Sequence, residues 1–187
     1  MIIETERLVL RPFTLDDLDE FTAINADPEV MRYFPSTMTK AQSTEAIERY
    51  LGKLAADGYS FLAAELEKTG ELAGVIGLSR FNAQLRTTIP GLPNVEVGWR
   101  LRRDLWGQGL ATEGAAACLD FGFQALNLPE IVAITSVGNT PSRRVMEKLG
   151  MSHVAGANFM HPMVPPESGL QEHVLYRIAN PEMRPDS

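Results

Sequence analysis

LRRDLWGQGLATEG, residues 101–114, is the most informative segment of the sequence, because a strand pattern ends in it and a helix pattern begins in it. Gly107 and Gly109 lie in the turn between the two, and glycine lets the backbone approach a ligand closely. The first amides of the following helix lack partners inside that helix, and the helix dipole adds partial positive charge there. The turn is therefore predicted to cradle a diphosphate, with Ala111 leaving the approach open and Thr112 offering a hydroxyl.

Other phosphate-binding turns fit this stretch less well. A P-loop requires Gly-Lys-Ser/Thr after its glycines, where this turn has Gly-Leu-Ala-Thr. A Rossmann fingerprint that starts at Gly107 places Thr112 where its third glycine or alanine belongs, and it normally follows a fully buried strand. An ordinary flexible loop before a helix is the remaining interpretation that these residues allow.

The sequence on either side of the turn predicts a mixed sheet. VEVGWRL, residues 95–101, alternates as a strand, and the helix after the turn runs to about Leu126 before another strand at 131–137. A crossover of this kind joins parallel strands. Upstream, strands at 59–67 and 72–81 flank turn residues and form an antiparallel hairpin. We expect an α/β fold with helices on both faces of this sheet.

The rest of the chain divides into further helices, strands and loops. Thr14 caps a first helix, whose first turn carries Asp16 and Asp17. Gly58 ends a longer helix over 39–57, and the apolar side of that helix carries Ala46, Ile47, Tyr50, Leu51 and Leu54. The other expected elements are a strand at 7–13, a short helix opened by Pro28 at 28–34, a loop at 82–94, a helix at 140–149, a strand from 151, a loop at 156–170 and a last strand at 171–178.

Composition bounds the class of protein. The 187 residues are 44% apolar and 22% charged, which is typical of a globular chain that buries one core. A net charge of -7 argues against broad binding to nucleic acid or to an anionic membrane. No segment reaches about 18 continuous apolar residues, and the start lacks a signal-peptide pattern. We expect one domain over 1–179 and a frayed tail over 180–187, in a cytoplasmic protein.

Four separated motifs give this sequence a family resemblance. WGQGLATEG, within the turn, resembles motif A of the GNAT superfamily of acyl-CoA-dependent N-acetyltransferases, in the form habitual in its RimJ/RimL-like branch. Trp106 departs from the Gln or Arg that usually opens this motif. ETERLVLRPF (4–13), DPEVMRYF (27–34) and NTPSRRVMEKLGM (139–151) resemble the first strand, the short second helix and motif B of that branch. The resemblance covers roughly residues 4–178. It implies a mixed, centrally splayed β-sheet of about six to seven strands with helices on both faces.

The resemblance implies that acetyl-CoA, as acetyl-donor co-substrate, is the ligand of the turn, and that no metal takes part. Arg102 and Arg103 would assist the phosphates, and the backbone of 101–103 would meet the pantetheine arm like an added strand. Asn139 would lie against that arm, cap its own helix, or do both. An amide of the same backbone would stabilise charge on the thioester oxygen. The expected cofactor-binding residues are Leu101, Arg102, Arg103, Trp106, Gly107, Gln108, Gly109, Leu110, Ala111, Thr112 and Asn139.

Glu96 is the candidate general base. GNAT enzymes transfer the acetyl group directly to an amine, which must be neutral to attack, whereas α-amino groups titrate near ~8 and lysines near ~10. A base is therefore useful, and the family often has a carboxylate on this strand. Alternation places Glu96 and Arg100 on one face and Trp99 on the other. The other interpretation is a structural carboxylate paired with Arg100 or another cation.

The expected acid departs from the family pattern. The tyrosine that usually serves as acid in motif B falls on Met146, which has no proton to donate. In the RimL-like branch a serine of the same helix, here Ser142, has been considered for the role. A serine hydroxyl is a weak acid, so it would hydrogen-bond the leaving sulfur and relay a proton. The alternative is that Ser142 only satisfies the first turn of its helix.

The acceptor is expected to be an amine, either a protein N-terminus or a small molecule. Tyr33 and Trp99 are the candidate substrate-binding residues, with Met31 and Phe34 in the same aromatic and apolar rim, although core packing explains each of them equally well. The loop at 156–169 is a candidate lid. The chain is expected to be a monomer or a homodimer.

Two other functions fit the same residues. Without the motif B tyrosine, the chain could be an acyl-CoA-binding or sensing protein with impaired catalysis. A nucleotide-dependent oxidoreductase would instead bind NAD(P). Cys118 lies among small residues and is interpreted as a buried side chain, not a nucleophile. The three histidines, His153, His161 and His173, lack a metal-binding spacing and are interpreted as structural or surface residues.

Overall fold

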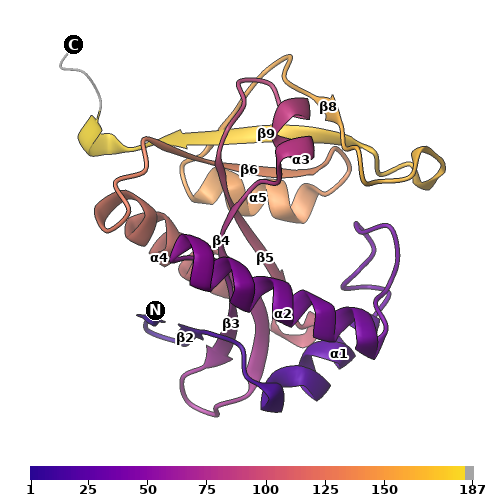
Figure 1. Cartoon of the computed structure of the whole chain (residues 1–187), viewed down its shortest axis with the longest axis vertical. Helices are drawn as coiled ribbons and strands as arrows, with labels where there is room; N and C mark the ends of the chain where they lie inside the picture. The colour runs from indigo at the N-terminus through magenta and orange to yellow at the C-terminus, as the bar shows by residue number, and fades with distance from the viewer. Residues whose placement is uncertain (184–187) are drawn as a thin grey trace.

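The computed structural model describes residues 1–183, and an open sheet runs through its centre (Figure 1). The sheet order is β1-β2-β3-β4-β5-β6-β9-β7, with β8 paired to β9. The strands are β1 (Ile3–Glu4), β2 (Leu8–Arg11), β3 (Phe61–Leu66), β4 (Leu72–Arg80), β5 (Val95–Leu101), β6 (Glu130–Ser136), β7 (Ser152–His153), β8 (Phe159–Met160) and β9 (Glu172–Ala179). The mixed α/β fold class is confirmed. Residues 1–183 form nine strands and not six to seven, because the two-residue strands β1 and β8 escape detection by periodicity. The strand expected from 151 is β7.

The sheet splays at its centre, between β5 and β6. β3, β4 and β5 form an antiparallel set, as the predicted hairpin required. β5 and β6 are parallel and pair at a single register position, Glu96 with Val132. β6 then pairs with β9 along its whole length, from Glu130 to Ser136. Because β5 has no such partner after Glu96, its carboxyl end separates from β6 and leaves an opening in the sheet.

Helices cover both faces of the sheet. The helices are α1 (Leu18–Ala26), α2 (Lys40–Asp57), α3 (Ala83–Thr88), α4 (Leu110–Gln124) and α5 (Thr140–Lys148). Alternate residues of β3 enter opposite cores: Ala63 packs with α1 and α2, whereas Leu62 packs with α4. Figure 1 shows α1 and α2 together on the viewer's side of β3 and β4. A smaller core holds Leu85 of α3 against Leu175 of β9.

Two segments differ from the sequence predictions. The expected loop 82–94 contains α3, because the Asn82 side chain accepts a hydrogen bond from the Leu85 amide and caps a short helix. The expected short helix at 28–34 is a series of turns instead. The Asp27 carboxylate accepts the amide of Glu29 there, and a local side-chain bond of this kind competes with helix formation.

Two further residues are placed differently from expectation. Leu51, expected on the apolar side of α2, is 38% exposed. The tail is ordered at its start, since Asn180 is buried and its backbone amide donates a hydrogen bond to the Pro129 carbonyl. Residues 184–187 of the expected tail lie outside the described residues. Gly58 ends α2 in the left-handed conformation, as predicted.

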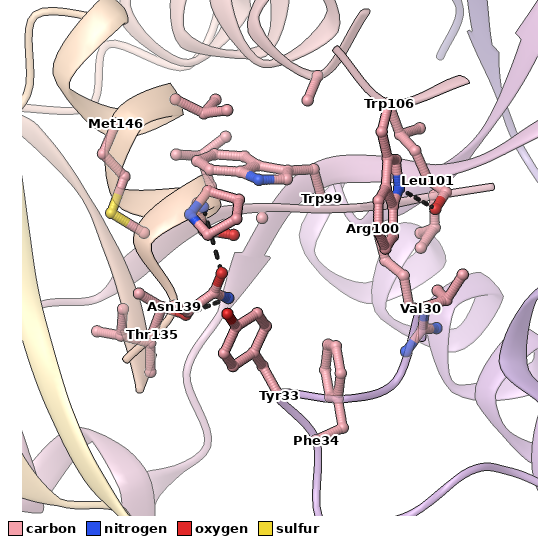
Figure 2. A pocket seen from close by; sticks show the side chains of 18 of the residues that line it. Val30, Tyr33, Phe34, Trp99, Arg100, Leu101, Trp106, Thr135, Asn139 and Met146 are labelled. Carbon is pink, nitrogen blue, oxygen red and sulfur yellow. Dashed lines mark hydrogen bonds between the residues drawn. The ribbon is translucent and has the colours of Figure 1, made fainter. Parts of the chain in front are cut away.

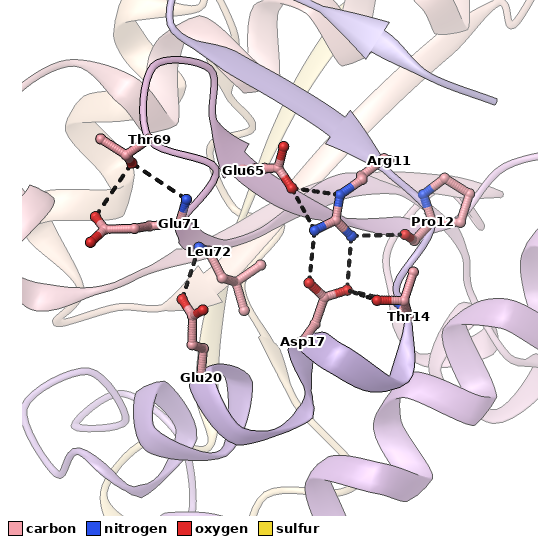
Figure 3. Close-up of polar contacts among 9 residues, drawn as sticks. All are labelled: Arg11, Pro12, Thr14, Asp17, Glu20, Glu65, Thr69, Glu71 and Leu72. Atoms are coloured by element: carbon pink, nitrogen blue, oxygen red, sulfur yellow. Dashed lines mark hydrogen bonds and ion pairs between the residues drawn. The ribbon is translucent and has the colours of Figure 1, made fainter.

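An ion-pair network fixes the start of α1 to the sheet (Figure 3). Arg11 of β2 donates to both carboxylate oxygens of Asp17, each at 2.8 Å, and to Glu65 of β3 at 2.8 Å. The Thr14 amide also donates to Asp17, at 2.7 Å. Burial would raise the pKa of Asp17, but the bonds from Arg11 and Thr14 outweigh it and lower that pKa. Asp17 therefore does more than complement the helix dipole, since it ties the helix to β2.

Replacing Arg11 with methionine is expected to lower the free energy of unfolding by about 2 to 3 kcal/mol at pH 7, because it leaves two carboxylates without their cation. Chemical denaturation measures this loss. Lys40→Met is the matched control, since the Lys40–Asp19 pair is exposed and contributes less than about 1 kcal/mol. The lowered pKa of Asp17 makes its contribution present above about pH 4 and lost below it, so the variant and wild type should converge in acid. Equal losses in the two variants would refute the network's role.

Candidate active site

A cavity of about 790 Å³ occupies the opening between β5 and β6 (Figure 2). Most of the residues expected to bind or react line it, namely Tyr33, Glu96, Trp99, Leu101, Trp106, Gly107, Gly109, Leu110, Ala111, Thr112, Asn139 and Ser142. Three expected cofactor residues, Arg102, Arg103 and Gln108, do not line it. The splay therefore brings one group of reactive and binding side chains together from β5, α4, α5 and the turns after α1.

The glycine turn opens its amides toward this cavity. Gly107 and Gly109 have φ angles of 76° and 83°, a left-handed conformation that favours glycine. Gly109 is the N-cap of α4 and has no side-chain cap. Along the start of α4, the Glu113 amide is the first that donates a hydrogen bond to a backbone carbonyl, that of Gly109. Within residues 1–183, no acceptor bonds the amides of 107–112. This arrangement suits an anion with several oxygens, because the unpaired donors converge where the helix dipole is positive.

Residues from the start of the chain brace the turn. The Glu113 carboxylate accepts hydrogen bonds from the Thr5 hydroxyl at 2.6 Å and from the Arg7 backbone and side chain. Arg7 also donates to the Gln108 carbonyl at 2.9 Å, from the far side of the turn. Burial opposes charge on Glu113, yet these bonds lower its pKa overall. The motif residues 4–13 thus hold the α4 N-terminus in place without entering the cavity.

The edge of β5 that faces the opening also carries unpaired amides. The Arg102 amide donates to Ala73 of β4, so alternation along the strand places the amides of Trp99 and Leu101 on the opposite edge, toward β6. The Leu101 carbonyl on that edge accepts the Trp106 indole N–H at 2.9 Å. An extended ligand lying in the opening would accept hydrogen bonds from these amides, as a neighbouring β-strand would.

Three expected cofactor residues lie on the outer side of the turn. Arg102 pairs with Asp104 at 2.8 Å and Glu71 at 3.4 Å, and it lines a small hollow with Arg103. The Gln108 side chain donates to the Asp104 carbonyl. Their contacts to acetyl-CoA stay predictions, and the geometry indicates that the Gln108 backbone is better placed than its side chain.

Glu96 lies at the point of the splay, where β5 and β6 make their one pairing. Burial raises the pKa of Glu96 to about 7, and the positive charge of Lys53 on α2 limits the rise. Lys53 is held by Ser79 at 2.7 Å and by the Arg80 carbonyl at 2.8 Å. Within the described chain Glu96 forms no ion pair with Arg100. Lys53 is the cation whose charge acts on Glu96, so the structural alternative with another cation stays open beside the role of base. A carboxyl with this pKa can accept a proton near neutral pH.

α5 presents Asn139, Ser142 and Met146 to the cavity. The Asn139 side chain accepts the Ser142 amide at 3.3 Å and donates to Thr135 at 2.8 Å, so its capping role is confirmed (Figure 2). Met146, at the position of the family's tyrosine, is 2% exposed. Ser142 supplies a hydroxyl to the cavity from α5, and Arg144 and Lys148 of the same helix also line it.

The expected substrate residues lie on different sides of β5. Both line the cavity (Figure 2): Trp99 does so while it packs against the core beneath α4, and Tyr33 does so from the turns after α1. The Arg32 guanidinium lies 4.8 Å from the centre of the Tyr33 ring. Phe34 is 40% exposed, but Met31 is buried and belongs to the packing beneath this segment.

The structure adds residues that the sequence did not single out. Arg100, His161 and His173 line the cavity. The two imidazole centres lie 4.8 Å apart, and burial together with the charge of His173 lowers the pKa of His161 to about 4. Only the alternation of β5 pointed to Arg100, by placing it on the face of Glu96. Nothing in the sequence pointed to the histidine pair, which depends on how β9 folds beside the loop before it.

Other expectations concern side chains outside the chemistry. Cys118 is buried within α4, as predicted, and burial raises the pKa of its thiol to about 12. Residues 1–183 contain no group of three or more His, Cys, Asp or Glu side chains arranged for a metal ion. No helix in the same range is long and apolar enough to cross a membrane.

Comparison with known proteins gives the family. The Acetyltransferase (GNAT) domain matches residues 7–152. The Bacillus subtilis protein YkkB is 33% identical over 80% of this chain and 84% of its own, and the same organism's YnaD, named an uncharacterized N-acetyltransferase, is 28% identical over 97% and 99%. A GNAT-family acetyltransferase from Bacillus anthracis superimposes with a TM-score of 0.77 at 26% identity, over 96% of this chain and 99% of its own. The chain therefore belongs to the GNAT acetyltransferase family, and it is an N-acetyltransferase.

Proposed function

We propose that this chain transfers an acetyl group from acetyl-CoA directly to a primary amine, as a member of the RimJ/RimL-like branch. The observation that carries the proposal is the row of unpaired amides at 107–112, which opens onto the splayed strands. Acetyl-CoA fits these donors because its diphosphate needs hydrogen-bond donors and its pantetheine arm can pair with the free edge of β5. When bound, it supplies an activated acetyl group.

The residues that line the cavity have different roles in the proposed reaction. Glu96 takes a proton from the acceptor ammonium, through water, because its raised pKa leaves it partly ionised and basic near neutral pH. The amides of Trp99 and Leu101 stabilise the negative charge that develops on the acyl oxygen. Asn139 lies against the pantetheine arm while it caps α5. As the new C–N bond forms and the C–S bond breaks, Ser142 hydrogen-bonds the departing sulfur and relays to it the proton that the acceptor nitrogen loses.

Ser142→Ala is expected to lower kcat by about tenfold, a modest general-acid effect for a weak acid. Affinity for coenzyme A should be unchanged, because the Ser142 contact with Asn139 uses the backbone amide. Initial-rate kinetics beside calorimetry with coenzyme A separate the two quantities. Thr140→Ala, in the same first turn, is the control. Full turnover by Ser142→Ala would remove Ser142 from the mechanism.

A thiol-release assay with acetyl-CoA against a panel of peptides and small amines tests the proposed function. We expect turnover with at least one acceptor. Binding of coenzyme A without turnover across the panel would favour the impaired, sensing alternative. Calorimetry with coenzyme A and NAD(P) in parallel tests the ligand class, and tight binding of NAD(P) alone would overturn the proposal.

Several broader expectations accompany this function as proposals. We place the catalytic domain over residues 1–179 and the protein in the cytoplasm, as a monomer or homodimer. Metal, nucleic acid and membrane have no part in the proposed reaction. Size-exclusion chromatography with light scattering measures the oligomeric state directly.

A further inference from the structure

Among residues 1–183, the buried guanidinium of Arg100 has no carboxylate partner. It lines the cavity from the same face of β5 as Glu96. Its Nε atom is buried and has no hydrogen-bond partner within residues 1–183. Its side-chain partners in that range are uncharged groups: the Met31 sulfur at 3.7 Å, which is a weak acceptor, and the hydroxyl of Tyr50. A buried charge of this kind is costly unless something neutralises it.

The surroundings of Arg100 are aromatic and cationic. The Phe21 and Phe34 ring centres lie 5.5 Å and 5.2 Å from its guanidinium carbon, and such contacts offset only part of the desolvation. Arg49 and Lys53 of α2 add positive charge on the same face. Glu29 also lines the cavity, but Arg32 pairs with it at 3.7 Å. Burial lowers the pKa of Arg100, yet a guanidinium remains charged at neutral pH.

We propose that the acceptor amine carries a carboxylate, which binds the guanidinium of Arg100 while the amine of the same molecule faces Glu96. The inference rests on the proposed function and names its substrate class. The guanidinium fork matches a carboxylate in geometry and charge. A polyamine acceptor fits poorly, because it would bring further cations beside an unneutralised one.

The spacing along β5 limits the size of the acceptor. Glu96 and Arg100 are four residues apart on one face, which separates their α-carbons by about 13 Å. Both side chains extend into the same cavity, and each reaches across part of this distance. A free amino acid, a short ω-amino acid or a dipeptide spans the remainder. The positive charge of Arg100 also favours the neutral form of a nearby amine, which is the form that attacks.

Matched acceptor pairs test the inference. Each α-amino acid, ω-amino acid and dipeptide is assayed with acetyl-CoA beside its amide, which keeps the shape and removes the charge, and an aliphatic diamine is included. We expect kcat/KM for the best acid to exceed that of its amide by about tenfold or more, as for a charge-assisted contact. Equal rates for acid and amide, or preference for the diamine, would overturn the inference and leave the proposed function intact. No turnover of any amine would instead remove the proposed function, and the inference with it.

Substitution of Arg100 tests whether this residue causes the preference for acids over amides. In Arg100→Met the acid-to-amide ratio should fall to about one, chiefly through a higher KM for the acid, whereas Arg100→Lys should keep an intermediate ratio. Arg80→Met is the matched control, because Arg80 is an exposed arginine on β4 that pairs with Asp57 away from the cavity. Retention of the wild-type ratio in both Arg100 variants would refute the assignment. The wild-type ratio tests the substrate class even if a variant does not fold.

Discussion

Gly109→Ala is expected to weaken binding of coenzyme A by more than tenfold. Gly109 adopts a φ of 83° at the N-cap of α4, where an alanine is strained and its methyl group narrows the approach to the free amides. A methyl group there meets only the end of the Arg7 side chain, at 3.6 Å, so the protein itself can accommodate it. Calorimetric titration with coenzyme A measures the loss.

Gly58→Ala is the matched control for this substitution. Gly58 has nearly the same φ, 79°, and nothing lies within 4 Å of the added methyl group, but it ends α2 away from the cavity. Both variants should lose about 1 kcal/mol of stability from the strained backbone. Only Gly109→Ala should lose affinity for coenzyme A. If the two variants bind it equally well, the turn does not hold the diphosphate.

Glu96→Gln is expected to lower kcat/KM by about 100-fold and to remove the inflection of the pH–rate profile near pH 7. The pKa of Glu96 is raised to about 7, so the base is protonated and inactive below this pH and becomes active above it. The variant should retain only the rise that comes from deprotonation of the acceptor amine. Initial rates between pH 5 and 9 at saturating acetyl-CoA measure both effects.

Lys53→Met provides the complementary change. Lys53 opposes the raised pKa of Glu96, so its removal should shift the inflection of the profile to higher pH while the inflection itself survives. Coenzyme A affinity serves as the folding control in both variants. An unchanged profile in Glu96→Gln would remove Glu96 from proton transfer.

The sequence predicted the central features of this fold for identifiable reasons. Period-two alternation at 95–101 placed Glu96 and Trp99 on opposite faces of β5, and the structure confirms it. The strand–turn–helix order required a parallel crossover, which β5 and β6 show. Both features depend on local backbone geometry, which local sequence specifies well.

Features that depend on tertiary packing escaped prediction. The two-residue strand β8 is too short to show a period and exists because β9 offers it an edge. α3 depends on one cap, Asn82, in a segment whose later prolines indicate a loop. Lys53 shares no motif with Glu96 and meets it only because α2 packs over β4 and β5. That Arg100 has no carboxylate partner among residues 1–183 could not be recognised either, since this is a property of the folded chain.

A crystal structure of the chain with coenzyme A would show whether the turn at 107–112 holds the diphosphate. We expect the diphosphate oxygens to lie about 3 Å from the backbone nitrogens of 107–112 and the sulfur to lie between β5 and β6. A diphosphate bound elsewhere, with those amides bonded to protein acceptors, would contradict it.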